Sequence, residues 1–208
     1  GKVTGVIYGS TSKKIKNYLL IGNKFHLNFN TKNESNVGYF KIEIDKIITP
    51  FFMDERNKLL CITYAMNLIK LLTVEGQQNL NIFKLAENLK KLLEDNNWLV
   101  KFIFWELNFY KSIGYDIEFK DYVNKEIEKN GNEIYYVKSS NKSVPNFLIN
   151  KNDNINDIND ILNGFKLVGD FLEKTILKTI GVNYPNSRID FYSSIKNLSQ
   201  FDQQNTKQ

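Results

Sequence analysis

Polar and apolar residues alternate along the first fifty positions of the chain. In Lys24–Phe29 and Tyr39–Ile44 nearly every step changes from polar to apolar, which is the period of a half-buried strand. Val3–Tyr8 is rich in β-branched and aromatic residues, and Gly5 allows a bend or bulge within it. The polar segment Asn30–Asn36 predicts a turn. Several short strands with polar loops predict a small barrel or curled sheet.

After a break at Thr49-Pro50 the period changes to that of helices. Gly114 and Gly181 are placed to end two of the four predicted helices. The apolar stripes that predict them are Ile62, Met66, Ile69 and Leu72; Ile82, Leu85, Leu89 and Leu92; the aromatic series Trp98, Phe102, Trp105, Phe109 and Ile113; and Ile158, Ile161, Phe165, Val168, Leu172, Ile176 and Ile180.

The segments between and after these helices are polar. Ile134–Val137 predicts a short hairpin, and Asn150–Asn159 predicts a loop. Asn186–Arg188 predicts the start of a final short helix capped by Ser or Asn. The sequence therefore predicts an α+β protein. Its parts are a β domain over 1–52, a helical domain over 53–199 with an insertion around 115–150, and a disordered tail over 200–208.

The excess positive charge of the chain lies in its first quarter. Eight lysines and three acidic residues fall between Gly1 and Met53, which leaves five positive charges, the net charge of the whole chain. The remainder holds twenty basic and twenty acidic residues. This asymmetry is typical of a protein that binds a polyanion, and a solvated lysine-rich surface accounts for it equally well.

Residues for catalysis or metal binding are sparse. The single cysteine, Cys61, excludes an intramolecular disulfide and a multi-cysteine zinc site, and its apolar surroundings fit core packing in a reducing compartment. The single histidine, His26, lies in a strand pattern without a neighbouring nucleophile, and no glycine-rich phosphate loop is present. Five carboxylates could hold a metal as in a nuclease, but they fit solvated loops or a helix N-terminus better: Asp116, Glu118, Asp153, Asp157 and Asp160.

No stretch of the sequence predicts a membrane span or a signal peptide, because lysine, asparagine or glutamate interrupts each apolar run well before about 20 residues. The chain opens at Gly1 without a methionine, so we expect its native N-terminus to be missing.

The loop from Tyr8 to Tyr18 carries the strongest sign of nucleic-acid binding. It joins two predicted strands, is rich in lysine and small polar residues, and has a tyrosine at each end. Lysines neutralise phosphates, hydroxyls and amides hydrogen-bond to them, and tyrosine stacks on bases. We predict DNA contacts from Lys2, Lys13, Lys14, Lys16, Tyr18 and Lys24.

The order of these features resembles the RecO family of bacterial recombination mediators. Gly1–Tyr18 looks like the end of the second strand of an OB barrel and the basic loop after it, and Gly22-Asn23 looks like the turn before the next strand. Three later motifs resemble, in order, the Glu-x-x-Leu-x-x-x-Gly-Tyr helix end, the Tyr-Val-Ser hairpin and the Arg-containing start of the last helix: Phe104–Tyr115, Tyr136–Ser139 and Pro185–Arg188.

The resemblance implies an N-terminal OB-type barrel followed by a helical domain with a small, often zinc-binding, insertion. It implies a cytoplasmic, nucleoid-associated protein of DNA repair and recombination, without enzymatic activity, that binds single- and double-stranded DNA and anneals complementary strands. RecR and the tail of single-stranded-DNA-binding protein are the implied partners in loading RecA. Tyr122 stands where the first zinc cysteine is expected, so we predict no metal or other cofactor. About twenty residues of the barrel are expected to be absent, which makes it incomplete.

The implied partner tail is acidic and aromatic, so it requires an apolar groove with a cation at its edge. We predict this groove on the aromatic helix at Trp98, Phe102 and Trp105, with Lys101 or Arg188 as the cation. The alternatives are that these aromatic residues form the core, and that the whole chain is an adaptor that does not bind DNA.

Overall fold

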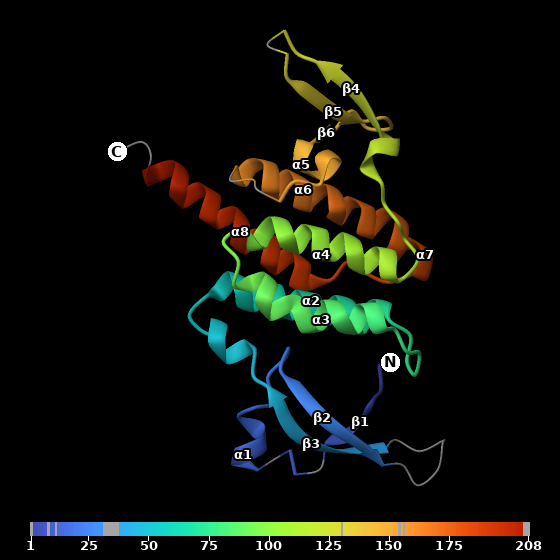
Figure 1. The fold of residues 1–208 in the computed structure, drawn as a ribbon, viewed down its shortest axis with the longest axis vertical. Helices are drawn as coiled ribbons and strands as arrows, with labels where there is room; N and C mark the ends of the chain where they lie inside the picture. The colour runs from blue at the N-terminus through green and yellow to red at the C-terminus, as the bar shows by residue number, and fades with distance from the viewer. Residues whose placement is uncertain are drawn as a thin grey trace. The chain divides into compact units, whose positions relative to one another are not determined.

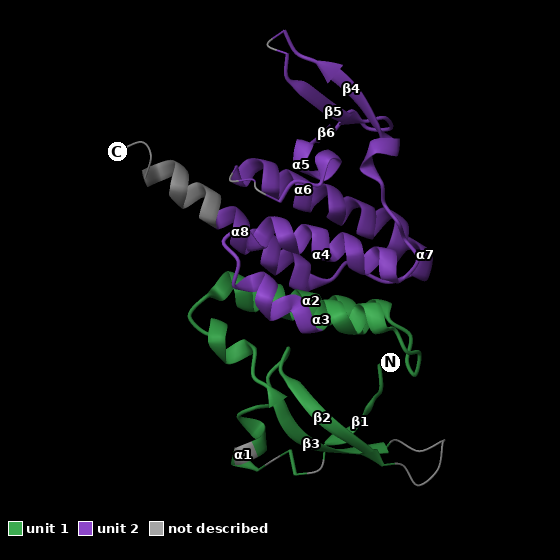
Figure 2. Cartoon of the chain, viewed as in Figure 1, with its two compact units in different colours: residues 1–86 green, residues 87–208 purple. Residues whose placement is uncertain are grey.

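The computed structural model describes residues 2–7, 9–10, 12–30, 38–129, 131–153, 155 and 157–205, without the side chains of Lys14 and of residues 198–205 (Figure 1). The chain forms two compact units, Gly1–Ala86 and Glu87–Gln208 (Figure 2). Both combine helices with a three-stranded sheet, so the predicted α+β class is confirmed. The division falls inside one helix, further along the chain than the change from strands to helices.

The sheet of the first unit contains the three predicted strands, β1 (Gly5–Ile7), β2 (Lys24–Asn30) and β3 (Gly38–Lys46). Their order is β1-β3-β2, with β1 parallel and β2 antiparallel to β3. Within the described residues β1 and β2 each pair with β3 alone, so these strands form an open sheet and do not close the expected barrel. The turn predicted at Asn30–Asn36 lies largely outside the described residues.

One face of this sheet is apolar because apolar residues occupy every second position of β2 and β3. Cross-strand partners share a face, so the register brings six of them together: Phe25 opposite Ile44, Leu27 opposite Ile42, and Phe29 opposite Phe40. Phe40 is buried, whereas 57% of Leu27 remains exposed.

A short helix, α1 (Lys13–Lys16), interrupts the segment predicted to be a loop. Ser12 is its N-cap, and the Ser12 side chain accepts a hydrogen bond from the Ile15 amide at 3.4 Å. No helical period is visible in this segment because a single turn is too short to show one. The capping serine was the available signal.

The turn before β2 is fixed by Gly22 and Asn23. Gly22 has φ +89°, and a Cβ there would lie 2.6 Å from Ile62 Cγ2. The side-chain amide of Asn23 donates from Nδ2 to the Tyr18 carbonyl at 2.9 Å. Its Oδ1 accepts from the backbone amides of Ile48 and Thr49 at 2.8 and 3.1 Å. This turn therefore ties the start of β2 to the end of β3.

The predicted helices of the middle region are present as α2 (Arg56–Leu72), α3 (Leu80–Leu93) and α4 (Trp98–Ser112), after a 3-10 turn η1 (Thr49–Phe52). Gly114 follows the end of α4 with φ +100°, as predicted for a C′ glycine. Cys61 is fully buried in α2, which confirms its place in the core.

The insertion is more regular than predicted. A 3-10 turn η2 (Phe119–Tyr122) leads into β4 (Val123–Ile127), β5 (Glu133–Val137) and β6 (Ser143–Val144), which form an antiparallel sheet in that order. A short helix α5 (Asn146–Asn150) follows. Only β5 was visible in the sequence, because β4 is mostly polar and exposed.

The last predicted long helix begins at Ile158 but is not uniform. It consists of α6 (Ile158–Phe171), a π-helical segment η3 (Leu172–Leu177) and α7 (Lys178–Ile180), and Gly181 with φ +67° ends it as predicted. The final helix α8 (Asn186–Asn205) is longer than the short helix expected. The predicted disordered tail therefore falls partly in α8 and partly, at 206–208, outside the described residues.

Candidate nucleic-acid interface

The lysines of α1 lie on the surface of the first unit. Lys13 and Lys16 are exposed and stand three residues apart, so they lie on the same side of the helical turn. Neither lysine forms an ion pair within the described part of the chain. The Lys14 side chain lies outside the described residues. Lys13 and Lys16 are therefore in a position to contact phosphates.

Tyr18 lies beside an apolar pocket instead of on an open surface. The pocket has a volume of about 330 Å³ and lies between α1 and the β2–β3 hairpin; its lining residues are Ile15, Tyr18, Phe25, Ile42, Glu43 and Ile44. Tyr18 is half-buried. Its surroundings fit packing against the apolar face of the sheet better than the predicted stacking on a base.

Lys2 is engaged within the first unit. Its ammonium group donates to the Lys70 carbonyl at 2.9 Å, in the last turn of α2, where a cation also interacts favourably with the helix dipole. The backbone beside it is held by Glu75, whose carboxylate accepts from the Thr4 amide at 2.8 Å. Lys2 is thus a poorer candidate for a phosphate contact than the lysines of α1.

Lys24 forms an ion pair with Asp45 across the hairpin, with Nζ 2.9 Å from Oδ2. This hydrogen bond is the main reason why the pKa of the Asp45 carboxyl is lowered. The same ammonium lies 5.5 Å from the ring centroid of Phe83 in α3. Lys46, opposite Lys24 in the register, and Lys84 are exposed cations that the sequence did not single out as site residues.

The aromatic residues predicted to line a partner groove are mostly core residues. Phe102 is fully buried and Trp105 is 3% exposed, and their rings stack on each other at 5.3 Å. The prediction that these two line an open groove was wrong, because both rings lie on the buried face of α4. Trp98 is half-buried, with its ring 6.2 Å from that of Phe191.

Lys101 is half-buried and lies next to two acidic side chains. Its ammonium pairs with Asp95 and lies 3.7 Å from Asp153 Oδ2. The hydrogen bond with Asp95 is the main cause of a raised pKa of Lys101 and of a lowered pKa of Asp95. A carboxylate from a partner would compete with both acids for this cation.

Arg188 is 2% exposed and belongs to the core of the second unit. Its guanidinium binds Glu106 in a two-pronged pair, with Nε 3.2 Å from Oε1 and Nη2 3.1 Å from Oε2. Nη2 also donates to the Phe165 carbonyl at 2.9 Å, and Nη1 donates to the Tyr184 hydroxyl at 3.0 Å. The prediction that Arg188 serves as a surface cation was wrong, because buried acceptors surround its guanidinium.

This ion pair joins two segments that the sequence singled out separately. Glu106 lies in Phe104–Tyr115 and Arg188 in Pro185–Arg188, 82 residues apart along the chain. Glu106 is fully buried and also accepts a hydrogen bond from the Tyr110 hydroxyl. Two of the motifs behind the family resemblance thus meet in the core.

The candidate metal ligands do not assemble into a site in the described part of the chain, where no group of three or more His, Cys, Asp or Glu side chains could hold a metal ion. Asp116 and Glu118 each pair with a lysine, Lys111 and Lys151. At the expected zinc position, Tyr122 is exposed. No described helix is long and apolar enough to cross a membrane.

Residues 53–153 match the family model described as the C-terminal region of recombination protein O, RecO. The match starts just after η1 and runs through α2, α3, α4, the insertion and α5. Over these residues the chain is similar to the RecO family. The predicted resemblance to the RecO family is thus confirmed over this region.

A curated RecO-family relative supports the assignment. The DNA repair protein RecO of Ehrlichia chaffeensis is 24% identical over 109 residues, which is 51% of this chain and 45% of that protein. The match thus spans a little under half of the length of this relative. No solved structure matches the chain.

Proposed function

We propose that this RecO-like chain is a DNA-binding recombination mediator. It binds single- and double-stranded DNA, promotes the annealing of complementary strands, and supports RecA loading together with RecR and single-stranded-DNA-binding protein, all without catalysis. The observation that carries the proposal is the exposed pair Lys13 and Lys16 on a unit with an excess of positive charge. Residues 1–86 hold twelve basic and six acidic residues, whereas residues 87–208 hold sixteen and seventeen.

The topology of the first unit supports an OB-type barrel as the DNA-binding fold. An OB barrel has five strands in a Greek-key arrangement. Here β1 is parallel to β3, β3 is antiparallel to β2, and α1 lies between β1 and β2 in the chain. Two more strands between the outer edges of β1 and β2 would close the barrel and cover the apolar face around Leu27. We propose that the three observed strands are the last three of such a barrel, which makes β1 its third strand and not the second, as the sequence resemblance suggested.

The DNA surface is proposed to centre on α1, with Lys13, Lys14 and Lys16 as phosphate contacts. Lys24 is partly neutralised by Asp45, and Lys2 is bound to the end of α2, so both contribute less. Phosphate contacts of this kind give affinity without sequence preference.

The partner contacts are proposed to lie on the second unit. Because Phe102, Trp105 and Arg188 are buried, a docking tail has to use other surface residues, and half-buried Trp98 is the one member of the predicted groove that a ring could still reach. The rival function is an adaptor that binds proteins alone, with its lysines serving only solubility.

Fluorescence anisotropy with a labelled oligonucleotide tests the proposal. The change is Lys13, Lys14 and Lys16 to alanine, and the control changes two exposed lysines of the insertion, Lys120 and Lys129, to alanine. We expect the first variant to bind more weakly and to lose about 2 units of the slope of log K against log[salt], about 0.7 per lost contact to a single strand.

The control should keep the affinity and slope of the original protein. Equal affinity and slope in the folded α1 variant would rule out α1 as the DNA surface. Absence of DNA binding by the original protein at low salt would favour the adaptor.

A further inference from the structure

Two large apolar side chains are exposed at the start of α3. Leu80 is 65% exposed and Phe83, one turn later, is 50% exposed. Their spacing places them on the same face of the helix, while Ile82 on another face is buried. Single exposed apolar residues are ordinary, but an aromatic ring and a leucine side by side form a patch that a ligand could cover.

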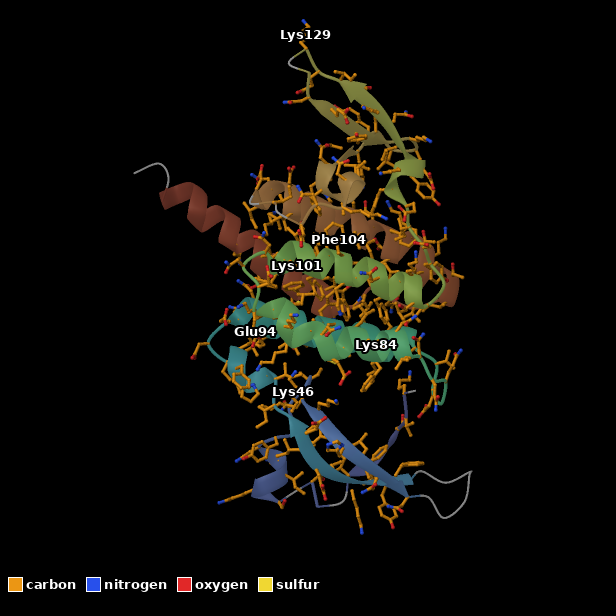
Figure 3. All side chains as sticks on the ribbon, in the orientation of Figure 1. Lys46, Lys84, Glu94, Lys101, Phe104 and Lys129 are labelled. Carbon is orange, nitrogen blue, oxygen red and sulfur yellow. The ribbon has the colours of Figure 1, made fainter. Side chains whose placement is uncertain are left out.

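The surroundings of Phe83 are cationic. Lys24 Nζ lies 5.5 Å from the ring centroid, which helps to hold the ring in place while half of its surface stays open. Lys46 is opposite Lys24 in the β2–β3 register, and Lys84 follows Phe83 in the chain; both are exposed. Figure 3 labels Lys46 on β3 and Lys84 on α3.

The local charge favours an anionic ligand. Lys24 is paired with Asp45, and the two exposed lysines Lys46 and Lys84 outnumber Glu87, the carboxylate one turn beyond Phe83 in α3. An exposed aromatic ring beside lysines combines the two elements that hold single-stranded nucleic acid: a platform on which a base stacks and cations for the phosphates on either side. A purely cationic surface would bind phosphates, but it would not distinguish unpaired bases from a duplex.

We propose that Phe83 is a stacking platform for a base of single-stranded DNA, with Lys46 and Lys84 as contacts to the neighbouring phosphates. The proposal rests on the DNA-binding function proposed above and adds a second contact point, on α3, to the one on α1. Within a duplex both faces of a base are covered by the adjacent base pairs, so we expect this contact to be specific for single strands.

The test compares Phe83→Ala with Phe83→Tyr in the full chain, using a labelled single-stranded oligonucleotide and a duplex of the same length. We expect Phe83→Ala to weaken single-strand binding by about tenfold, in the range reported for loss of one base–aromatic stack, and to leave duplex binding nearly unchanged. Phe83→Tyr retains a ring and should retain the affinity. The matched control is Phe51→Ala, which removes a phenylalanine of the same unit that is 64% exposed.

A second measurement distinguishes the loss of base stacking from a general loss of apolar contact surface. Phe83→Trp places an indole at the platform, and stacking of a base on an indole quenches its emission. We expect single-stranded DNA to quench this variant more than the original protein, whose tryptophans Trp98 and Trp105 lie in the second unit.

Three outcomes would overturn the proposal: unchanged single-strand affinity of Phe83→Ala, equal losses for single strand and duplex, or no added quenching in Phe83→Trp. In the first case, with the original protein still binding DNA, the proposed function stands, and the patch of Leu80 and Phe83 would be assigned to binding a protein partner. If the original protein binds neither form of DNA, the proposed function itself fails.

Discussion

The buried pair of Glu106 and Arg188 offers the sharpest test of the core of the second unit. Arg188→Met removes the guanidinium and keeps a long apolar side chain. Glu106 is fully buried, and its carboxylate would lose both hydrogen bonds from the guanidinium. The Phe165 carbonyl and the Tyr184 hydroxyl would each lose a donor as well.

The expected loss is large because the buried carboxylate of Glu106 loses the guanidinium that pairs with it. Breaking a buried ion pair on one side typically costs about 3–5 kcal/mol. Whole domains are stable by only about 5–15 kcal/mol, so this change removes a substantial part of the stability. With a urea m value of about 2–3 kcal/mol per M, the midpoint of unfolding should fall by roughly 1–2 M.

Tryptophan fluorescence during urea unfolding measures this effect directly, because Trp98 and Trp105 both lie in the second unit. The control is Lys125→Met, which breaks an ion pair with Glu133 in which both side chains are nearly half exposed; it should shift the midpoint little. The double variant Glu106→Leu, Arg188→Met removes both charges and should be more stable than Arg188→Met alone. A midpoint for Arg188→Met no lower than that of the control, or a double variant less stable than the single, would refute the reasoning.

Three further predictions follow from the described contacts. Gly22→Ala should lower stability by about 1–3 kcal/mol, since φ is +89° and the new Cβ would approach Ile62, and a urea midpoint matching the original would contradict it. The protein should hold far less than one zinc per chain by elemental analysis, because the insertion has Tyr122 in place of a cysteine; a stoichiometric amount would show that prediction to be wrong. Burial raises the pKa of Tyr184, so the folded state prefers its neutral form; this contribution to stability is present below the unfolded pKa of about 10 and is lost as pH rises through the folded pKa. Tyr184→Phe should lessen the alkaline fall of the urea midpoint, and an identical fall in both proteins would exclude this group as its cause.

Periodicity identified most of the long elements of the fold. Strands β2 and β3 and helices α2 to α4 follow patterns of alternating or 3.6-spaced apolar residues, and the glycines at 114 and 181 end helices as expected. Elements too short or too polar to show a period were missed, which explains α1, α5 and β4. The π-helical turn in Leu172–Leu177 leaves the apolar spacing nearly that of an α-helix, so it could not be predicted from that spacing.

The candidate site was only partly visible in the sequence, because the residue type gives the charge but not its surroundings. Lys13 and Lys16 are exposed as expected, whereas Lys2 and Lys24 are engaged by a helix end and by Asp45. Arg188 shows the limit most clearly. A cation at the start of a helix is expected at the surface, but the buried acceptors of Arg188, among them Glu106 82 residues away, make it a core residue.

The central claim is that this chain binds DNA through exposed lysines of its first unit. A titration of the full chain with a labelled single-stranded oligonucleotide over a series of salt concentrations tests that claim most directly. Contacts from Lys13, Lys14, Lys16, Lys46 and Lys84 predict a slope of log K against log[salt] of about −3.5, at about 0.7 per lysine. Binding that is absent at low salt, or that does not weaken as salt rises, would contradict the account.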